Sequence, residues 1–318
     1  MANELYTNAR CSALESKLLT KKKLVEIIEG NTDEAIKILN ENKIGEGIEN
    51  ILDYEKMLVQ EKQKLYSLIK TLNPSKDIQE YFMLKIDFLN AEILYRIKVT
   101  KNEQLVKLFE LEGMVSIDLL RKSLETKKYD NLPKGIIKSF DELEKCRELT
   151  SKKISATFKK NYYSELELKD KILMQIIRTK IDLINIETFF RVSTIEEFED
   201  EMIEKGRISK EFFVSLYKAK SNEEKLKISK ECYLFDDIKK IIDNGKENRF
   251  FDIEKRIDDV PLEILRNYKY EISGNIPLLR YLFEYEAQMK NICIVLVGLI
   301  NKLDSEEIKE RLRCGYER

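Results

Sequence analysis

One helical segment occurs three times in this chain with the same polar signature. Residues 85–96 (KIDFLNAEILYR) recur at 180–191 (KIDLINIETFFR) with the shared order Lys-Ile-Asp, Asn, Glu, aromatic, Arg. A weaker copy at 287–296 (AQMKNICIVL) keeps the asparagine and an amide three residues before it. The asparagines are 95 and 106 residues apart, whereas solenoid repeats span only about 20 to 50 residues. The spacing predicts three related helical domains, at 1–112, 113–205 and 206–318, and favours a scaffold over a catalyst.

Composition and periodicity predict an all-α fold. The 318 residues include only 10 glycines and 4 prolines, and 36% of the side chains are charged. Apolar residues recur at helical spacing. We expect a helix hairpin in each third of the chain: 46–72 with 76–99, 136–161 with 165–192, and 247–271, interrupted at Pro261, with the third signature helix.

A polar stripe runs along each signature helix. Arg178, Asp182 and Asn185 are spaced four and three residues apart, which places them on one helix face. A catalytic interpretation requires this face to converge on a reactive group. We expect instead that the polar groups pair with one another or with neighbouring backbone, since buried polar groups must be paired. The residues of this structural polar stripe are Asp87, Asn90, Arg178, Asp182, Asn185, Gln288 and Asn291.

A second match follows the first two signature helices. Gly113-Met114-Val115-Ser116 corresponds to Gly206-Arg207-Ile208-Ser209. Ser116, Ser209 and Asp304 are predicted to be equivalent N-cap residues, because each can accept a hydrogen bond from the exposed amides of a starting helix.

The residue inventory argues against most chemistry. The chain has no histidine, which removes the commonest general acid-base group and metal ligand. Neither Gly245-Lys246-Glu247 nor Gly45-Glu46-Gly47 completes a phosphate-binding or dinucleotide motif. The balance of 57 basic and 58 acidic side chains gives no concentrated cationic face for nucleic acid. We therefore predict no catalytic residue, no cofactor and no metal site.

The sequence also indicates the cellular compartment of the protein. The five cysteines are far apart and form no zinc-type or thioredoxin-type spacing, which fits a reducing cytosol. No secretory signal is expected at the polar N-terminus. The longest apolar run, 292–300, is well short of the roughly 20 residues that a membrane-crossing helix needs, so it is predicted to be a buried core helix.

Both ends of the chain resemble one protein family. The opening segment 6–20 (YTNARCSALESKLLT) is similar to the start of the C subunit of archaeal and bacterial V-type (A-type) rotary ATPases, a family that includes the d subunit of the eukaryotic enzymes. The closing segment is similar to the family's ending, with Glu284 to Glu286, Asn291-Ile292, Val297-Gly298, 305–308 (SEEI), Arg311-Leu312 and Tyr316. Cys293 and Leu299 stand where the family often has basic residues, which puts in doubt ionic contacts from those two positions.

The resemblance implies a funnel of three pseudo-symmetric helical-bundle domains around a central cavity. It also implies a non-catalytic rotor subunit on the cytoplasmic face of the membrane, which joins a proteolipid ring to central axle subunits of the D and F type. No small-molecule substrate is expected. Tyr6, Arg10, Glu286 and Tyr316 match recurring family positions and are either interface residues or internal packing. Two alternatives remain open: a helical interaction scaffold of another cytosolic complex, and an all-α enzyme that uses carboxylates.

Overall fold

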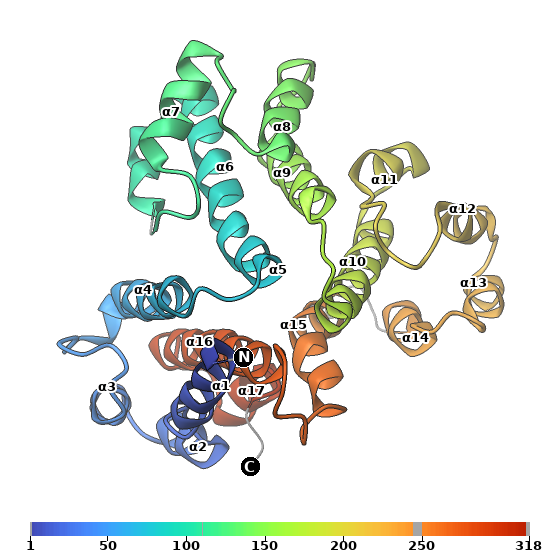
Figure 1. Ribbon diagram of the computed structural model, residues 1–318. Helices are drawn as coiled ribbons and strands as arrows, with labels where there is room; N and C mark the ends of the chain where they lie inside the picture. The colour runs from blue at the N-terminus through green and yellow to red at the C-terminus, as the bar shows by residue number, and fades with distance from the viewer. Residues whose placement is uncertain (1, 110, 244–249, 316–318) are drawn as a thin grey trace. The chain divides into compact units, whose positions relative to one another are not determined.

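The computed structural model describes residues 2–109, 111–243 and 250–315. Within these ranges the chain forms helices and connecting turns and no β-strand, which confirms the all-α prediction (Figure 1). The chain divides into two compact units. The first combines residues 1–75 and 258–318, and the second covers 76–257.

The first unit is built around α16 (Ile276–Ile300). This helix is buried on most sides, as expected of a helix that is apolar around most of its circumference. It packs against α1, α2, α3, α4 and α17, and α1 crosses it in Figure 1. The other helices of the unit are α1 (Ala2–Glu15), α2 (Lys21–Glu29), α3 (Thr32–Glu41), a 3₁₀ turn (Ile51–Asp53), α4 (Tyr54–Leu72), the end of α15 (Phe251–Arg266) and α17 (Ser305–Arg311).

The second unit contains two groups of helices, α5 to α9 and α10 to α14 (Figure 1). Clusters of aromatic rings form their cores: Tyr95, Phe140 and Phe158 in the former group, and Phe189, Phe198 and Phe213 in the latter. The elements are α5 (Lys76–Gln79), a π-helical turn (Glu80–Leu84), α6 (Lys85–Thr100), a 3₁₀ helix (Glu103–Leu108), α7 (Ile117–Thr126), α8 (Lys134–Glu144), α9 (Ser151–Glu165), α10 (Lys171–Arg191), α11 (Ile195–Glu201), α12 (Lys210–Lys218), α13 (Asn222–Ser229) and α14 (Phe235–Asp243).

Two of the predicted helices have other boundaries in the structure, because local capping residues start helices at other positions. The single helix predicted at 136–161 is two helices, because the Thr150 hydroxyl accepts from the Lys153 amide and starts α9. The turn predicted at 162–164 lies inside α9. The next helix, α10, starts after Asp170, whose carboxylate accepts from the amides of Ile172 and Leu173.

Two further boundaries were predicted wrongly. Helix α4 begins at Tyr54 and not at 46, because Gly45 and Gly47 adopt left-handed φ angles of 66° and 83°. Helix α15 continues through Pro261. Proline removes one backbone donor, and burial of the neighbouring Val260 and Leu262 accompanies the intact helix.

The three signature segments lie on α6, α10 and α16. The three domain boundaries and the funnel stay predictions. The apolar run at 292–300 belongs to α16, where Ile292, Val295 and Leu296 are buried in the core. Among the described residues, no helix is both long enough and apolar enough to cross a bilayer.

Candidate functional site

The signature asparagines make the same kind of contact in all three copies. Asn90 donates from Nδ2 to the carbonyl of Leu111, 2.8 Å away. Asn185 donates to the Ile203 carbonyl at 2.8 Å and accepts from the Ile203 amide at 2.9 Å. Each asparagine therefore ties its helix to backbone about 20 residues further along the chain.

Asn291 completes the set. Its Nδ2 donates to the Arg313 carbonyl at 3.2 Å, and its Oδ1 accepts from the Arg313 amide at 2.7 Å. The segment that follows α17 is thus held in the same manner as the segments that follow the 3₁₀ helix Glu103–Leu108 and α11.

The signature aspartates hold the next residues of the first two loops. Asp87 accepts from the amides of Met114 and Val115, each at 3.0 Å. Asp182 accepts from the amides of Arg207 at 2.9 Å and Ile208 at 3.0 Å. Both carboxylates are fully buried. Hydrogen bonds of this kind, from an amide to an ionised carboxylate, are among the stronger ones in proteins.

The two matched glycines make these contacts possible. A Cβ atom on Gly113 would lie 2.2 Å from Asp87 Oδ1, and one on Gly206 would lie 2.1 Å from Asp182 Oδ1. No side chain fits at either position without displacing the carboxylate. The repeated Gly-x-Val/Ile-Ser sequence is therefore explained by close approach of the loop backbone to the helix.

Asp182 also has a side-chain partner. The Tyr233 hydroxyl donates to its Oδ2 at 2.6 Å. Burial and the adjacent carboxylate raise the pKa of Tyr233, which keeps the hydroxyl protonated. The Arg207 guanidinium lies over the Tyr233 ring at 5.2 Å from its centroid.

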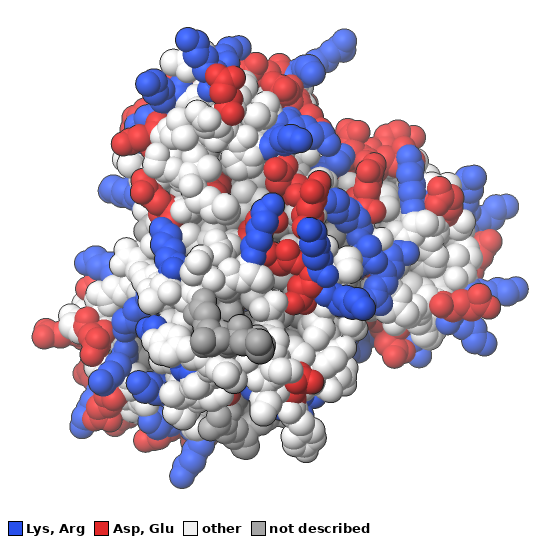
Figure 2. Space-filling model, in the orientation of Figure 1, with Lys and Arg blue, Asp and Glu red and all other residues white. Residues whose placement is uncertain are grey.

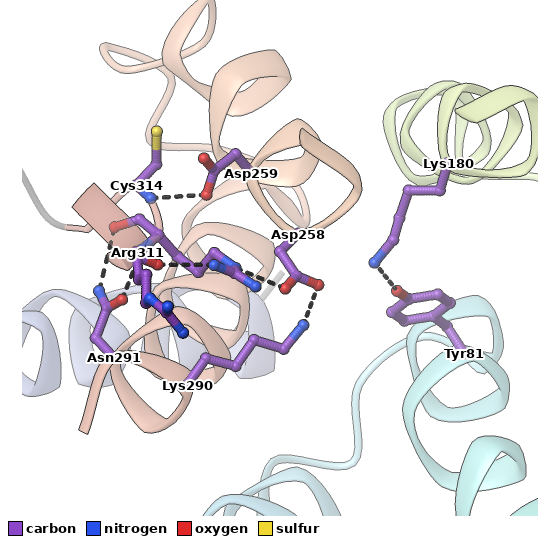
Figure 3. Close-up of polar contacts among 9 residues, drawn as sticks. Tyr81, Lys180, Asp258, Asp259, Lys290, Asn291, Arg311 and Cys314 are labelled. Atoms are coloured by element: carbon purple, nitrogen blue, oxygen red, sulfur yellow. Dashed lines mark hydrogen bonds and ion pairs between the residues drawn. The ribbon is translucent and has the colours of Figure 1, made fainter. Parts of the chain in front are cut away.

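In the third copy, a residue of another helix binds the loop amide. Gln288 occupies the position of the aspartate, but its Oε1 accepts from the Leu19 amide at 2.6 Å. The loop amide of Cys314 donates instead to Asp259 of α15, at 2.7 Å (Figure 3). A carboxylate from a neighbouring helix therefore replaces the missing acid of the signature.

Beside this contact, Asp258 forms ion pairs with two basic side chains. Its carboxylate pairs with Lys290 and accepts from Arg313 Nε at 2.8 Å (Figure 3). Burial opposes ionisation, but the two cations outweigh it and hold the pKa of the Asp258 carboxyl below its ordinary value. Sequence reasoning missed Asp258 and Asp259. The only available signal was an acidic pair beside Pro261.

One member of the polar stripe, Arg178, differs from the others in its exposure. Arg178 is exposed on α10, unlike the buried Asp182 and Asn185.

Ser116, Ser209 and Asp304 are the N-cap residues of α7, α12 and α17. The predicted equivalence is wrong for Asp304, because it precedes the segment that Asn291 binds, whereas Ser116 and Ser209 follow the segments that Asn90 and Asn185 bind. The Ser116 hydroxyl and the Asp304 carboxylate accept from their helices, whereas Ser209 makes no capping bond from its side chain.

Two of the four predicted interface residues contact each other. Arg10 donates from Nη1 to the Tyr6 hydroxyl at 3.2 Å, and Tyr6 is 58% exposed. Arg10 also lines a cavity of about 710 Å³ in the first unit. Glu286 is half-buried on α16. Tyr316 lies outside the described residues.

The described residues contain no group of three or more cysteine, aspartate or glutamate side chains that could hold a metal ion. On the face shown in Figure 2, basic and acidic side chains are interspersed and form no large area of one sign.

Comparison with known proteins gives a consistent result. A model of the ATP synthase (C/AC39) subunit family matches residues 7–311. The C subunit of the V-type sodium ATPase of Enterococcus hirae is 24% identical over 276 residues, which cover 83% of each chain. The C subunit of the A-type ATP synthase of Methanocaldococcus jannaschii is 22% identical over an alignment of 361 positions that covers 98% of this chain and 86% of the relative.

Proposed function

The chain belongs to the ATP synthase (C/AC39) subunit family, and from this membership we propose that it is the non-catalytic central-rotor coupling subunit of a V/A-type rotary ATPase. In this role it joins the proteolipid ring of the membrane sector to the central axle subunits of the D and F type. It transmits torque between ATP turnover and ion transport, as a peripheral component on the cytoplasmic face of the membrane. The observation that carries the proposal is the family match over residues 7–311.

The internal contacts of the protein are consistent with a mechanical role. A protein that transmits torque must resist deformation, so its loops must be fixed to its helices. Asn90, Asn185 and Asn291 each bind loop backbone from a buried position. Buried, fully paired polar networks make a structure rigid and specify a single arrangement.

The amino-acid composition and motifs of the chain are consistent with a non-catalytic role. The chain has no histidine and no complete phosphate-binding motif. Phosphoryl transfer depends on such a cradle or on bound metal ions. We propose that neither nucleic acid nor a small-molecule substrate is a partner of this protein.

The proposal is tested by assembly. The full chain is mixed with the purified axle subunits and with a detergent-solubilised proteolipid ring, and co-elution is measured by size-exclusion chromatography. We expect one complex that contains all components. A chain that elutes alone from both partners would favour the alternative of a scaffold for another cytosolic complex.

Charge reversal tests the interface residues. Arg10→Glu and Glu286→Lys are compared with Lys22→Glu, a change on the exposed surface of α2. If Arg10 and Glu286 lie in the interface, their variants lose affinity for the axle or the ring while Lys22→Glu does not. Folded variants with unchanged affinity and full coupling of ATP turnover to ion transport would assign both residues to internal packing.

A further inference from the structure

The 710 Å³ cavity of the first unit has three helical walls. α1 and α4 each pack on α16, and the cavity lies between them, with the segment 41–46 at one end. Its volume falls within the ~300 to 1,000 Å³ of ordinary ligand pockets. Nothing in the proposed rotor function uses this cavity.

Two buried donors on α16 face the cavity without a partner. Tyr281 and Gln288 both line it and are only 4% and 7% exposed. Gln288 uses its Oε1 to accept from Leu19. Within the described part of the chain, neither the Gln288 amide nitrogen nor the Tyr281 hydroxyl has a hydrogen-bond acceptor. Neither atom is among the fully enclosed unpaired polar atoms of the described residues, so both are reached from the cavity and can donate to an acceptor there.

Two cations line the same cavity. Arg10 lies on α1, and Lys17 lies in the turn that follows the end of this helix at Glu15. Neither forms an ion pair with a carboxylate of the described residues, and the polar partner of Arg10 is the neutral Tyr6. Their positive charge is available to a ligand.

The register of α1 against α16 matches cations to donors. Asn8 donates to the carbonyl of Ile272, Arg280 pairs with Glu15, and the Leu19 amide donates to Gln288. The partners ascend together along the two segments 8–19 and 272–288, which contain the end of α1 and the start of α16, so the two helices run in the same direction. Arg10 consequently lies toward the Tyr281 end of the cavity, and Lys17 toward the Gln288 end.

The buried acid of the cavity, Glu61, has its own partners in the cavity wall. Glu61 accepts from the Tyr285 hydroxyl at 2.5 Å, from Lys64 Nζ at 2.7 Å and from the Gly45 amide at 3.0 Å. Its charge is therefore offset within the wall. Glu41, the last residue of α3, and Glu46, in the loop that follows, are exposed at one end of the cavity, beside Lys43.

Apolar groups occupy the space between the two polar ends. Leu14 stands between Arg10 and Lys17 in the sequence, and the ring of Tyr285 stands between Tyr281 and Gln288 on α16. Leu65 and Leu68 of α4 complete the apolar lining. Tyr281 and Gln288 are separated by seven positions of α16, which is about 10 Å along the helix.

We propose that this cavity binds an elongated dianion: two carboxylate-like groups at the ends of an apolar chain about 10 Å long. One anionic group pairs with Arg10 and accepts from Tyr281, and the other pairs with Lys17 and accepts from Gln288. The chain lies against Leu14, Leu65 and Leu68. The ligand is a bound molecule and not a substrate, and the inference does not depend on the proposed rotor function.

The test is calorimetric titration of the full chain with decanedioate. Butanedioate has both charges without the length, decanoate has the chain without the second charge, and 1,10-diaminodecane has the opposite charge. We expect saturable binding of decanedioate to one site, at least ~10-fold tighter than either anionic control, because a charged hydrogen bond is typically worth about that factor. The diamine should not bind. No saturable binding of decanedioate, or equal binding of decanedioate and decanoate, would overturn the proposal.

Variants locate the site. Arg10→Gln and Lys17→Gln should each weaken decanedioate binding by about 10-fold, and Tyr281→Phe, which removes only the hydroxyl, by about 3-fold to 10-fold. Lys22→Gln on α2 is the matched control and should leave binding unchanged. Circular dichroism confirms that each variant is folded. If the folded Arg10 and Lys17 variants bind as tightly as the unaltered chain, the dianion is held elsewhere and the assignment of this cavity is wrong.

Discussion

Asn185 and Ile203 exchange two hydrogen bonds, in which the asparagine side chain mimics a backbone group of a β-ladder: its amide nitrogen donates to the Ile203 carbonyl and its oxygen accepts from the Ile203 amide. Asn291 makes the same pair of bonds with Arg313. One asparagine side chain thus pairs with both backbone polar groups of a loop residue, the amide and the carbonyl. Because Asn185 and Ile203 are both buried, water cannot replace either bond.

Replacing Asn185 by leucine should lower the free energy of unfolding by about 2–6 kcal/mol, since two buried backbone groups lose their partners at about 1–3 kcal/mol each. Urea unfolding followed by circular dichroism measures the change. Arg178→Ala, on an exposed position of the same helix, is the control and should change stability by less than about 0.5 kcal/mol. Equal effects of the two substitutions would mean that the polar stripe acts as one exposed surface.

Gly206→Ala should destabilise the protein by about 2 kcal/mol or more, because the added Cβ would lie 2.1 Å from Asp182 Oδ1 and would displace the carboxylate from the loop amides. The change should be smaller in an Asp182→Ala background, where no carboxylate remains to be displaced. A double-mutant cycle of unfolding free energies measures this coupling. Strictly additive effects would contradict the close contact.

Asp258 should make stability depend on pH in the acidic range. Lys290 and Arg313 hold its folded-state pKa below the ordinary value, so the unfolded chain binds the proton more readily. The stabilisation is present above the unfolded pKa of about 3.9 and is lost as the pH falls through the folded pKa.

Asp258→Asn should therefore lower stability at pH 7 by about 1–3 kcal/mol, the usual range for charge-assisted hydrogen bonds. Its deficit relative to the unaltered chain should shrink between pH 5 and pH 3. Unfolding in urea at a series of pH values provides the measurement. Asp130→Asn, an exposed position in the second unit, is the control. A deficit that stays constant across this range would show that the ion pairs do not contribute.

The isolated full chain should neither bind nor hydrolyse ATP, because it lacks a complete phosphate-binding motif and phosphoryl transfer requires preorganised positive groups around the phosphates. Isothermal titration with Mg-ATP and a phosphate-release assay test the two statements. Saturable binding at micromolar concentration would count against a purely mechanical role.

The sequence predicted that the stripe side chains are paired, and it showed a repeated glycine loop, because both recur at constant local spacing. Asp182 and Asn185 are three residues apart on one helix, and a glycine follows at a similar distance in two copies, so both the helix and its loop could be recognised. Asp259 could not be recognised in the same way. It belongs to α15 and replaces a residue of α16, and only the packing of the two helices brings it to the Cys314 amide.

The amino-acid sequence by itself determined the helical class, the signature helices and the residues that tie the following loops to them, because helix periodicity and capping are local properties of the chain. The tertiary structure decided which backbone groups those side chains bind, the substitution of Asp259 for a missing signature acid, and the cavity between α1, α4 and α16. These features join residues up to 269 positions apart, as in the bond from the Leu19 amide to Gln288. Contacts over such separations depend on how whole helices pack, and that packing follows from the buried surface of many residues together.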